Sequence, residues 1–362
     1  MKKFLALALA LCMVFALCAC GKAAAPAANT GAPAAPAADK PTEDAPAAPA
    51  DEPVELVIGG VTSQSAKDAV IKFGELVEEY SGGTVTIQDF PDNILGDDAQ
   101  RWEMTQTGEC DISIGSTSSV STTYNDFFLY DIPFFFLSKQ EVYEVGFGGE
   151  AGQKILAGLE SVGLKGLAMW ENGFRNLTTN NTPVHTVADV KGLKIRTMEN
   201  PIHLAAWKQM GANPTPMSFS ELFTAMQQGT VDGEENPIGI ITGNSFQEVE
   251  KYIMISEHVY TPYYVVMNLD KWNSLSPAQQ EAVEKAMAEA TTYQYAQSQK
   301  YEDEGIGVME AAGCTVIVFD EATKLEFKAA VEPADCLSIA KEKMANPELA
   351  DLMNQELEAY RG

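Results

Sequence analysis

Arginine is scarce in this chain, which makes each guanidinium a candidate for a specific chemical role. The 362 residues contain only four arginines, although the formal net charge is −27. Arg196 closes the apolar-alternating stretch GLKIR, and Arg175 follows the apolar stretch GLAMW within WENGFRNLT. A guanidinium can hold a carboxylate through two parallel hydrogen bonds, which a lysine cannot reproduce. Both arginines are therefore candidates for binding a small acid.

Composition leaves two interpretations of Arg196 open. It forms a structural salt bridge, with Glu199 or Glu171 as partner, or it faces an anionic ligand. Ligands of open α/β sheets bind outside the carboxyl ends of the strands, so two arginines from neighbouring strand ends can converge on one acid. Trp170 and Phe219 would supply an apolar wall, although a core position suits either aromatic residue at least as well.

Strand and helix patterns alternate around these residues. We predict strands at 54–60, 84–90, 111–115, 166–170, 192–196 and 314–319, from short apolar or alternating runs. Helices are predicted at 66–80 and 97–107, and at 218–229, where Ser218 and Glu221 have capping-box spacing. The alternation of strand and helix predicts an α/β fold with a mostly parallel sheet.

One helical pattern is too long for an ordinary helix. It opens with Ser276 as N-cap, Pro277 and Gln279, and no helix breaker occurs before Gly305. Such a helix would be about 40 Å long at 1.5 Å per residue. We expect it to cross from one domain to the other.

The N-terminus predicts export and lipidation. MKKFLALALALCMVFALCAC has a basic start and a short apolar run, which fits a signal peptide (1–19) better than a transmembrane anchor. Leu17-Cys18-Ala19-Cys20 looks like a bacterial lipobox, with Cys20 as the acylated residue. The rest of 20–53 is rich in Ala and Pro and has nothing to bury, so it reads as a tether.

The folded body from Val54 onward has about 310 residues, which suits two domains. Loss of Lys2 and Lys3 with the signal peptide leaves 22 basic against 51 acidic residues, a charge of −29. This balance excludes nucleic acid as a partner, and an anionic ligand must be held by a few local cations.

Several other features predict structure without chemistry. The apolar segment 127–137 is expected to be buried in the protein and not in a membrane. GFGGEAG has the wrong glycine spacing for a dinucleotide loop. The acid pairs Asp97-Asp98 and Glu234-Glu235 are read as solvated faces.

Metal and disulfide chemistry has little support. The body keeps three cysteines, of which one pair could form a disulfide, and three histidines without metal-ligand spacing. We predict no metal, no cofactor and no catalytic residues.

At the arginines the sequence resembles a known family. ADVKGLKIRTMENPIHLAAWKQMGANPTPMSFSELFTAMQQGTVDGEENP (188–237) resembles the signature core of the DctP-type substrate-binding proteins of tripartite ATP-independent periplasmic (TRAP) transporters. WENGFRNLT, DIPFFF, DFPDNILGDD, GECDISIG and SLSPAQQEAVEKA resemble further family segments in the family order.

The resemblance implies a two-domain periplasmic-binding-protein-like fold, with a ligand cleft between the domains and the long helix linking them. Domain 1 would comprise 54–172 with 261–301, and domain 2 would comprise 173–260 with 302–362. By position, Arg196 would clamp the ligand carboxylate and Arg175 would be a second, ligand-dependent arginine. Asn236 would hydrogen-bond the same carboxylate, and Phe219 would pack against the ligand.

One departure from the family narrows the ligand. Sialate-binding members carry an acid and an arginine after the third strand, whereas this chain has the uncharged GSTSS (115–119). The first strand ends in Val61-Thr62, where those members have an asparagine. A smaller mono- or dicarboxylate is implied instead, with Thr62, Ser116 or Ser118 as first-domain contacts.

The function implied is that of a non-enzymatic solute-binding lipoprotein, which delivers an organic acid to membrane permease subunits. It would lie in the periplasmic space or at the outer face of the cytoplasmic membrane. The alternative is a ligand-sensing protein that presents a carboxylate to a receptor kinase. The sequence has no pattern that pairs a catalytic nucleophile with a base, so a secreted hydrolase is not supported. C4-dicarboxylates, keto acids, sugar acids and aromatic acids all remain open as ligands.

Overall fold

The computed structural model describes residues 51–362, which belong to one compact unit. The predicted signal peptide, Cys20 and the tether as far as residue 50 lie outside the described residues. No helix in the described part of the chain is both long and apolar enough to cross a membrane. The phenylalanine-rich segment 127–137 is largely buried, which confirms its assignment to the protein interior.

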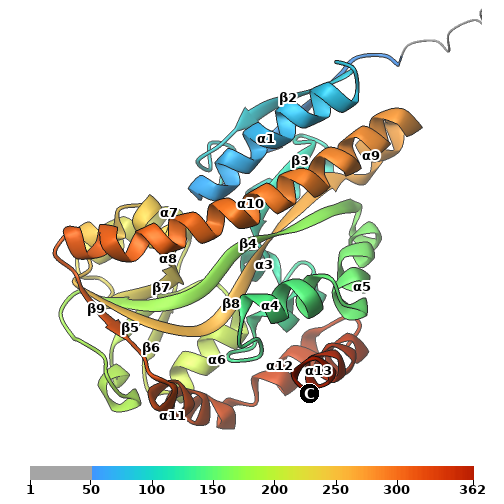
Figure 1. Ribbon diagram of the computed structural model, residues 1–362. Helices are drawn as coiled ribbons and strands as arrows, with labels where there is room; N and C mark the ends of the chain where they lie inside the picture. Colours follow the sequence, from blue (N-terminus) through green and yellow to red (C-terminus); the bar gives the residue numbers. More distant parts are fainter. Residues whose placement is uncertain (1–50) are drawn as a thin grey trace, which may run out of the picture. The chain divides into compact units, whose positions relative to one another are not determined.

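Within residues 51–362, nine strands form one mixed sheet with the order β2-β1-β3-β8-β4-β7-β5-β6, and β9 pairs with β8 (Figure 1). Their bounds are β1 Val54–Gly59, β2 Val85–Phe90, β3 Ile112–Ser116, β4 Leu164–Thr179, β5 Lys194–Thr197, β6 Asn213–Pro216, β7 Gly233–Pro237, β8 Tyr252–Asn268 and β9 Thr315–Val318. The group β1 to β3 pairs in parallel, and so does the group β5 to β7.

Strands β4 and β8 join the two parallel groups, and they run antiparallel to each other and to their inner neighbours β3 and β7. The prediction of a mostly parallel sheet is therefore right for the two groups and wrong for the centre. The sequence obscured β4 because its pairing with β8 shifts register at three points, including the one between Glu171 and Gly173. From the sequence alone, the polar residues at this bulge are mistaken for a turn.

The helices occupy the predicted regions and several more. Their bounds are α1 Gln64–Tyr80, α2 Asp98–Thr107, α3 Thr117–Val120, α4 Lys139–Glu141, α5 Glu150–Gly158, α6 Pro201–Gln209, α7 Phe219–Gln227, α8 Ile238–Gly243, α9 Leu269–Ser274, α10 Pro277–Ala311, α11 Glu321–Val331, α12 Cys336–Lys343 and α13 Glu348–Arg361. A π-helical turn, Val142–Phe147, precedes α5, so GFGGEAG (146–152) begins within a helical turn and does not follow a strand.

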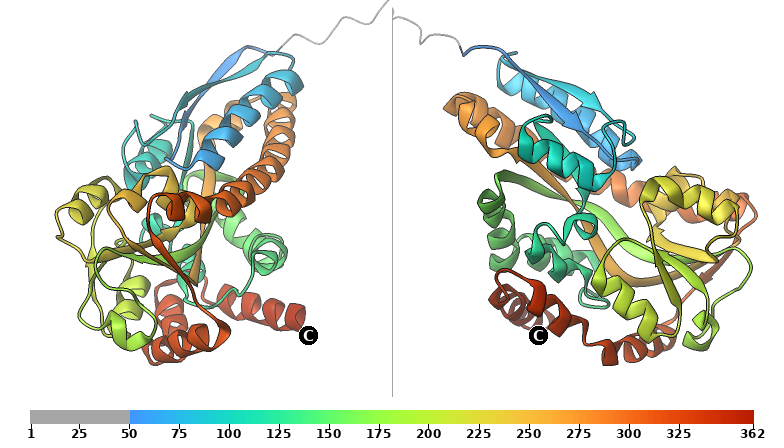
Figure 2. Two further views of the ribbon diagram at one scale, coloured as in Figure 1. Left: turned by 60° about the vertical axis from the view of Figure 1, so that its left-hand side comes forward. Right: turned by 180° about the vertical axis from the view of Figure 1, so that it is seen from behind.

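Helix α10 is the predicted long helix. Its capping box of Ser276 and Gln279 forms as expected, but the helix continues past Gly305 to Ala311. It contacts α1 and β4 and, towards its C-terminal end, α8 and β9 (Figures 1 and 2). The capping box predicted for α7 is absent, because the Ser218 side chain makes no cap hydrogen bond and lies 3.0 Å from the hydroxyl of Ser220.

Two apolar clusters cover the two faces of the central strands. Consecutive residues of β4 alternate between them, since Met169 belongs to the cluster with the phenylalanine-rich segment and Trp170 to the cluster with α1 and α10. The three cysteines of the body, Cys110, Cys314 and Cys336, are free, so the possible disulfide among them does not form.

Candidate functional site

One pocket contains most of the predicted site residues. It encloses about 780 Å³ of empty space, a figure that includes open solvent at its mouth. Six predicted residues line it, namely Arg196, Arg175, Asn236, Phe219, Ser116 and Thr62. Both parallel strand groups contribute, and so do the N-terminal ends of α2 and α7.

Two predicted residues do not line this pocket. Trp170 is fully buried, and its indole nitrogen donates a hydrogen bond to Thr291 Oγ1 on α10 at 2.8 Å. The hydroxyl of Ser118 donates to the buried carboxylate of Asp131. Trp170 thus joins the sheet to the long helix, and Ser118 holds η1 (Asn125–Asp131) against α3.

Arg196 has no acidic partner in the described part of the chain. Its side chain is 2 % exposed, and Nε and Nη2 both donate to the main-chain oxygen of Met217, at 3.2 and 2.8 Å. Among the described residues, no carboxylate lies within 4.0 Å of its nitrogens. Of the two salt-bridge partners considered, Glu171 pairs with Lys139 at 2.7 Å, and Glu199 is exposed.

The guanidinium of Arg196 is therefore buried without a carboxylate in contact, although the more distant charges of Glu234, Glu235 and Asp98 favour its charged form. Burial, and then the nearby charge of Arg175, lower the pKa of Arg196 to about 10, so the guanidinium is still cationic at neutral pH. Holding a buried charge without a counter-ion costs free energy, which an anion in the pocket would recover. This arrangement favours the ligand interpretation of Arg196 over the structural one.

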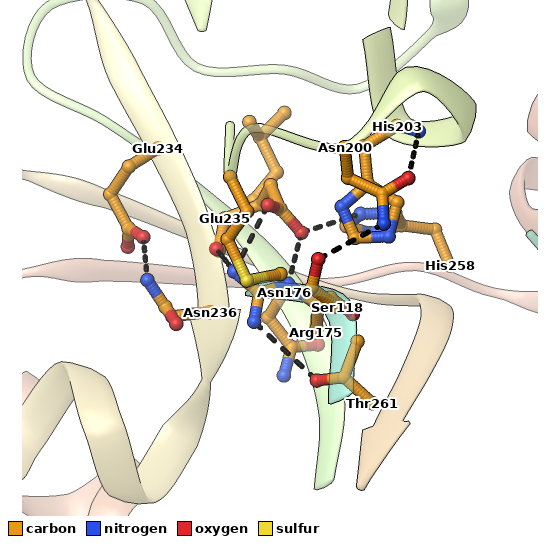
Figure 3. A network of polar contacts seen from close by, with 12 residues as sticks. Ser118, Arg175, Asn176, Asn200, His203, Glu234, Glu235, Asn236, His258 and Thr261 are labelled. Atoms are coloured by element: carbon orange, nitrogen blue, oxygen red, sulfur yellow. Dashed lines mark hydrogen bonds and ion pairs between the residues drawn. The ribbon is translucent and has the colours of Figure 1, made fainter. Parts of the chain in front are cut away.

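Arg175, by contrast, has a carboxylate partner. Its Nε and Nη2 donate to the two carboxylate oxygens of Glu235 on β7, the latter at 3.0 Å to Oε1 (Figure 3). Burial alone would raise the pKa of Glu235, but the charge of Arg175 and the ring of His258, whose Nε2 lies 3.4 Å from Oε2, hold that pKa well below its usual range. The Arg175 charge is thus neutralised by a fully buried carboxylate.

The position of Arg175 also differs from the prediction. It lies within β4, where it pairs with Pro237 of β7, and not at the end of a strand. Strand β7 separates β4 from β5, so the two arginines come from strands that are not neighbours.

Asn236 lies beside a buried acid. Its amide nitrogen donates to Glu234, which also accepts from Thr178 Oγ1 at 3.1 Å. Burial raises the pKa of Glu234 to about 7, despite that hydrogen bond from Asn236. Glu234 and Glu235 are both fully buried, so their interpretation as a solvated acidic face is wrong.

The pocket lining also contains polar residues that the sequence did not single out. The Asp98 carboxylate binds the guanidinium of Arg101 through Oδ1 and accepts from the Ser116 main-chain nitrogen through Oδ2 at 3.2 Å. Asn172 donates through Nδ2 to Thr261 Oγ1 at 3.3 Å, and its buried Oδ1 has no partner among the described residues. The scarcity of arginine could have singled out Arg101. Asp98 lies three residues before it on the same helix and pairs with it, so the same signal could have led to Asp98.

The remaining lining residues complete the pocket wall. They are Val61, Asn93, Asp97, Ala99, Ser119, Met198, Glu199, Met217, Ser218, Ile240 and Tyr263. Within residues 51–362, no group of three or more His, Cys, Asp or Glu side chains is arranged to hold a metal ion.

Three comparisons place this fold and pocket among known proteins. Residues 60–337 match the family model DctP, described as bacterial extracellular solute-binding protein, family 7. The 2,3-diketo-L-gulonate-binding periplasmic protein YiaO of Escherichia coli is 36% identical over 264 residues, which cover 72% of this chain and 80% of YiaO. The C4-dicarboxylate-binding periplasmic protein DctP of Rhodobacter capsulatus is 34% identical over 245 residues, or 67% and 73% of the two chains.

A solved structure agrees with the sequence relatives. The sugar acid binding protein DctPAm of Advenella mimigardefordensis, in complex with galactonate, has a TM-score of 0.81 and 29% identity. The match covers 85% of this chain and 99% of that one. The matched family and structures are solute-binding proteins with a two-domain fold, which confirms the predicted fold. They are not enzymes, which confirms the prediction of no enzymatic activity. Nothing in them supports the sensing alternative. The chain belongs to the DctP family of bacterial extracellular solute-binding proteins, the substrate-binding proteins of TRAP transporters.

Proposed function

We propose that this protein binds a small organic acid outside the cytoplasm, with its carboxylate on Arg196, and delivers it to the membrane permease subunits of a TRAP transporter. The observation that carries the proposal is the buried guanidinium of Arg196, which lines the pocket and has no carboxylate partner among the described residues. The relatives support the ligand class, because they are named for diketogulonate, C4-dicarboxylates and a sugar acid.

Other lining residues assist in this proposal. Arg175 offers hydrogen-bond donors from a neutral ion pair, and Asn236 keeps one amide hydrogen beyond the one it gives to Glu234. Phe219 supplies apolar contact. Thr62 and Ser116 are the hydroxyl groups of the first-domain wall.

We propose that the pocket lies between two domains with the division expected from the sequence. Thr62, Asp98 and Ser116 fall in domain 1 (54–172 with 261–301), and Arg196 and Phe219 fall in domain 2 (173–260 with 302–362).

We propose that acylation of Cys20 holds the mature protein on the membrane, with the Ala- and Pro-rich tether between the lipid and the folded body.

A thermal-shift screen tests the binding proposal. The purified mature protein is heated with several dozen organic acids at neutral pH, and each active acid is compared with its uncharged primary amide. A ligand that binds only the folded state raises the melting temperature, so we expect one group of acids to raise it and their amides to leave it unchanged. A panel without any stabilising acid, or amides that act as strongly as acids, would contradict carboxylate binding.

A further inference from the structure

We propose that the pocket selects acids with one carboxylate and several hydroxyl groups, and that it discriminates against dicarboxylates. This inference rests on the proposed binding of a carboxylate to Arg196, and it names the class of acid. It follows from the charge balance of the pocket wall and from the acceptors that this wall leaves without donors.

The charges of the pocket wall leave a place for one ligand carboxylate. Arg175 is neutralised by Glu235, and Asp98 is neutralised by Arg101. Of the lining residues, Arg196 is then the one cation without a counter-charge.

The remaining charged residues of the lining are acidic. Asp97 and Glu199 both line the pocket, and neither has a cationic partner within 4.0 Å among the described residues. A second ligand carboxylate would therefore meet carboxylates without a free cation to offset them, in a protein whose mature charge is already −29.

The uncharged part of the ligand must donate hydrogen bonds. Asn172 Oδ1 is buried and has no donor among the described residues, and the Asp98 carboxylate lines the same pocket. Asn236 gives one amide hydrogen to Glu234, and its carbonyl oxygen is a further acceptor. A ligand hydroxyl can donate to such acceptors, whereas an ionised carboxylate and a methylene group cannot.

Four acids of equal chain length separate charge from hydroxylation. Butyrate has one carboxylate and no hydroxyl group, and trihydroxybutyrate has one carboxylate and three hydroxyl groups. Succinate has two carboxylates and no hydroxyl group, and tartrate has two carboxylates and two hydroxyl groups. Calorimetric titration of the mature protein should give the tightest binding for trihydroxybutyrate, by at least about tenfold over each of the others, since tenfold corresponds to roughly one good contact. The six-carbon pair gluconate and glucarate repeats the comparison for a longer ligand.

The outcomes separate this inference from the proposal beneath it. Succinate, tartrate or glucarate binding as tightly as the matched monocarboxylate overturns the single-charge inference but leaves carboxylate binding intact. Butyrate matching trihydroxybutyrate overturns the hydroxyl requirement alone. Failure of every acid in these sets and in the wider screen overturns the proposed function as well.

Two variants locate the selectivity in named residues. Glu235→Gln removes the counter-charge of Arg175, so the affinity for succinate should rise relative to butyrate by about tenfold. Because Glu235 is buried and this variant can fail to fold, Asn172→Ala provides an independent test: it should weaken trihydroxybutyrate binding about tenfold and leave butyrate unchanged. Asn354→Ala on α13, outside the pocket, is the matched control. Equal losses for both acids in Asn172→Ala would overturn the assignment of Asn172 as a hydroxyl acceptor.

Discussion

Glu250 differs from the other buried acids near the site because nothing compensates its carboxyl group. It is 1 % exposed, and neither carboxyl oxygen has a hydrogen-bond partner among the described residues. Burial, and then the charges of Glu234 and Asp232, raise the pKa of Glu250 to about 9. Glu250 is therefore protonated in the folded protein at neutral pH.

This raised pKa makes stability depend on pH in a defined direction. The folded state binds the proton of Glu250 more tightly than the unfolded state, so this contribution is present at low pH and is lost as pH rises from about 5 to 9. Within that window the loss is at most about 1.4 kcal/mol per pH unit. Glu250→Gln cannot ionise and should show a flatter decline in the free energy of unfolding, measured by urea denaturation at pH 5, 7 and 9.

The control is Glu248→Gln, two residues away at an exposed position. It should follow the pH dependence of the unsubstituted protein. Parallel curves for Glu250→Gln and the unsubstituted protein would show that Glu250 does not carry a raised pKa.

At the residue scale, the scarcity of a residue type was a better guide to the pocket residues than its chemical character. The scarcity of arginine led to Arg196 from composition alone. Its environment then excluded a salt bridge among the described residues, which supports the proposed ligand contact. The same reasoning could not foresee Glu235 as the partner of Arg175, because the pairing joins β4 to β7 across 60 positions of sequence. Trp170 shows the converse, since an aromatic residue beside a site arginine turned out to be core.

At the scale of elements, helix α10 contains two glycines in opposite environments. A Cβ at Gly305 would clash with Cγ2 of Ile238 on α8, whereas a Cβ at Gly307 meets no atom within 4 Å. Gly307→Ala should stabilise the protein by about 0.5–1 kcal/mol through the lost backbone freedom of glycine. Gly305→Ala should instead destabilise it, by about 1–3 kcal/mol, because overpacking outweighs that gain.

Chemical denaturation of the two variants measures this difference directly. Each variant carries the same substitution in the same helix, so helix propensity is matched and only the contact with α8 differs. Equal stabilisation by both would mean that α10 does not pack closely against α8 at Gly305.

The elements that the sequence predicted are those with local signals. Capping residues placed the start of α10 correctly, because Ser276 and Gln279 act within one turn. Its end was missed, since packing of Gly305 against Ile238 keeps the helix intact beyond a nominal breaker. Strand β4 was seen only in part, because its antiparallel pairing with β8 is non-local and irregular.

At the scale of the whole molecule, residues of both proposed domains line the pocket, Thr62 and Ser116 from one and Arg196 and Phe219 from the other. A ligand that contacts both should favour a closed arrangement by hinge motion. Small-angle scattering of the mature protein should then show a smaller radius of gyration at ligand saturation. An unchanged scattering profile at saturation would count against closure.

The central claim is that Arg196 holds the ligand carboxylate, and calorimetric titration with the most stabilising acid tests it most directly. A charge-assisted hydrogen bond contributes about 1.5–3 kcal/mol, and a bidentate contact makes two of them. Arg196→Ala should therefore cost at least about 3 kcal/mol and weaken binding by at least about a hundredfold, at 1.4 kcal/mol per decade. Arg361→Ala, which breaks an ion pair with Glu141 outside the pocket, should leave the affinity unchanged. If folded Arg196→Ala binds the acid as tightly as the unsubstituted protein, Arg196 is not the carboxylate site.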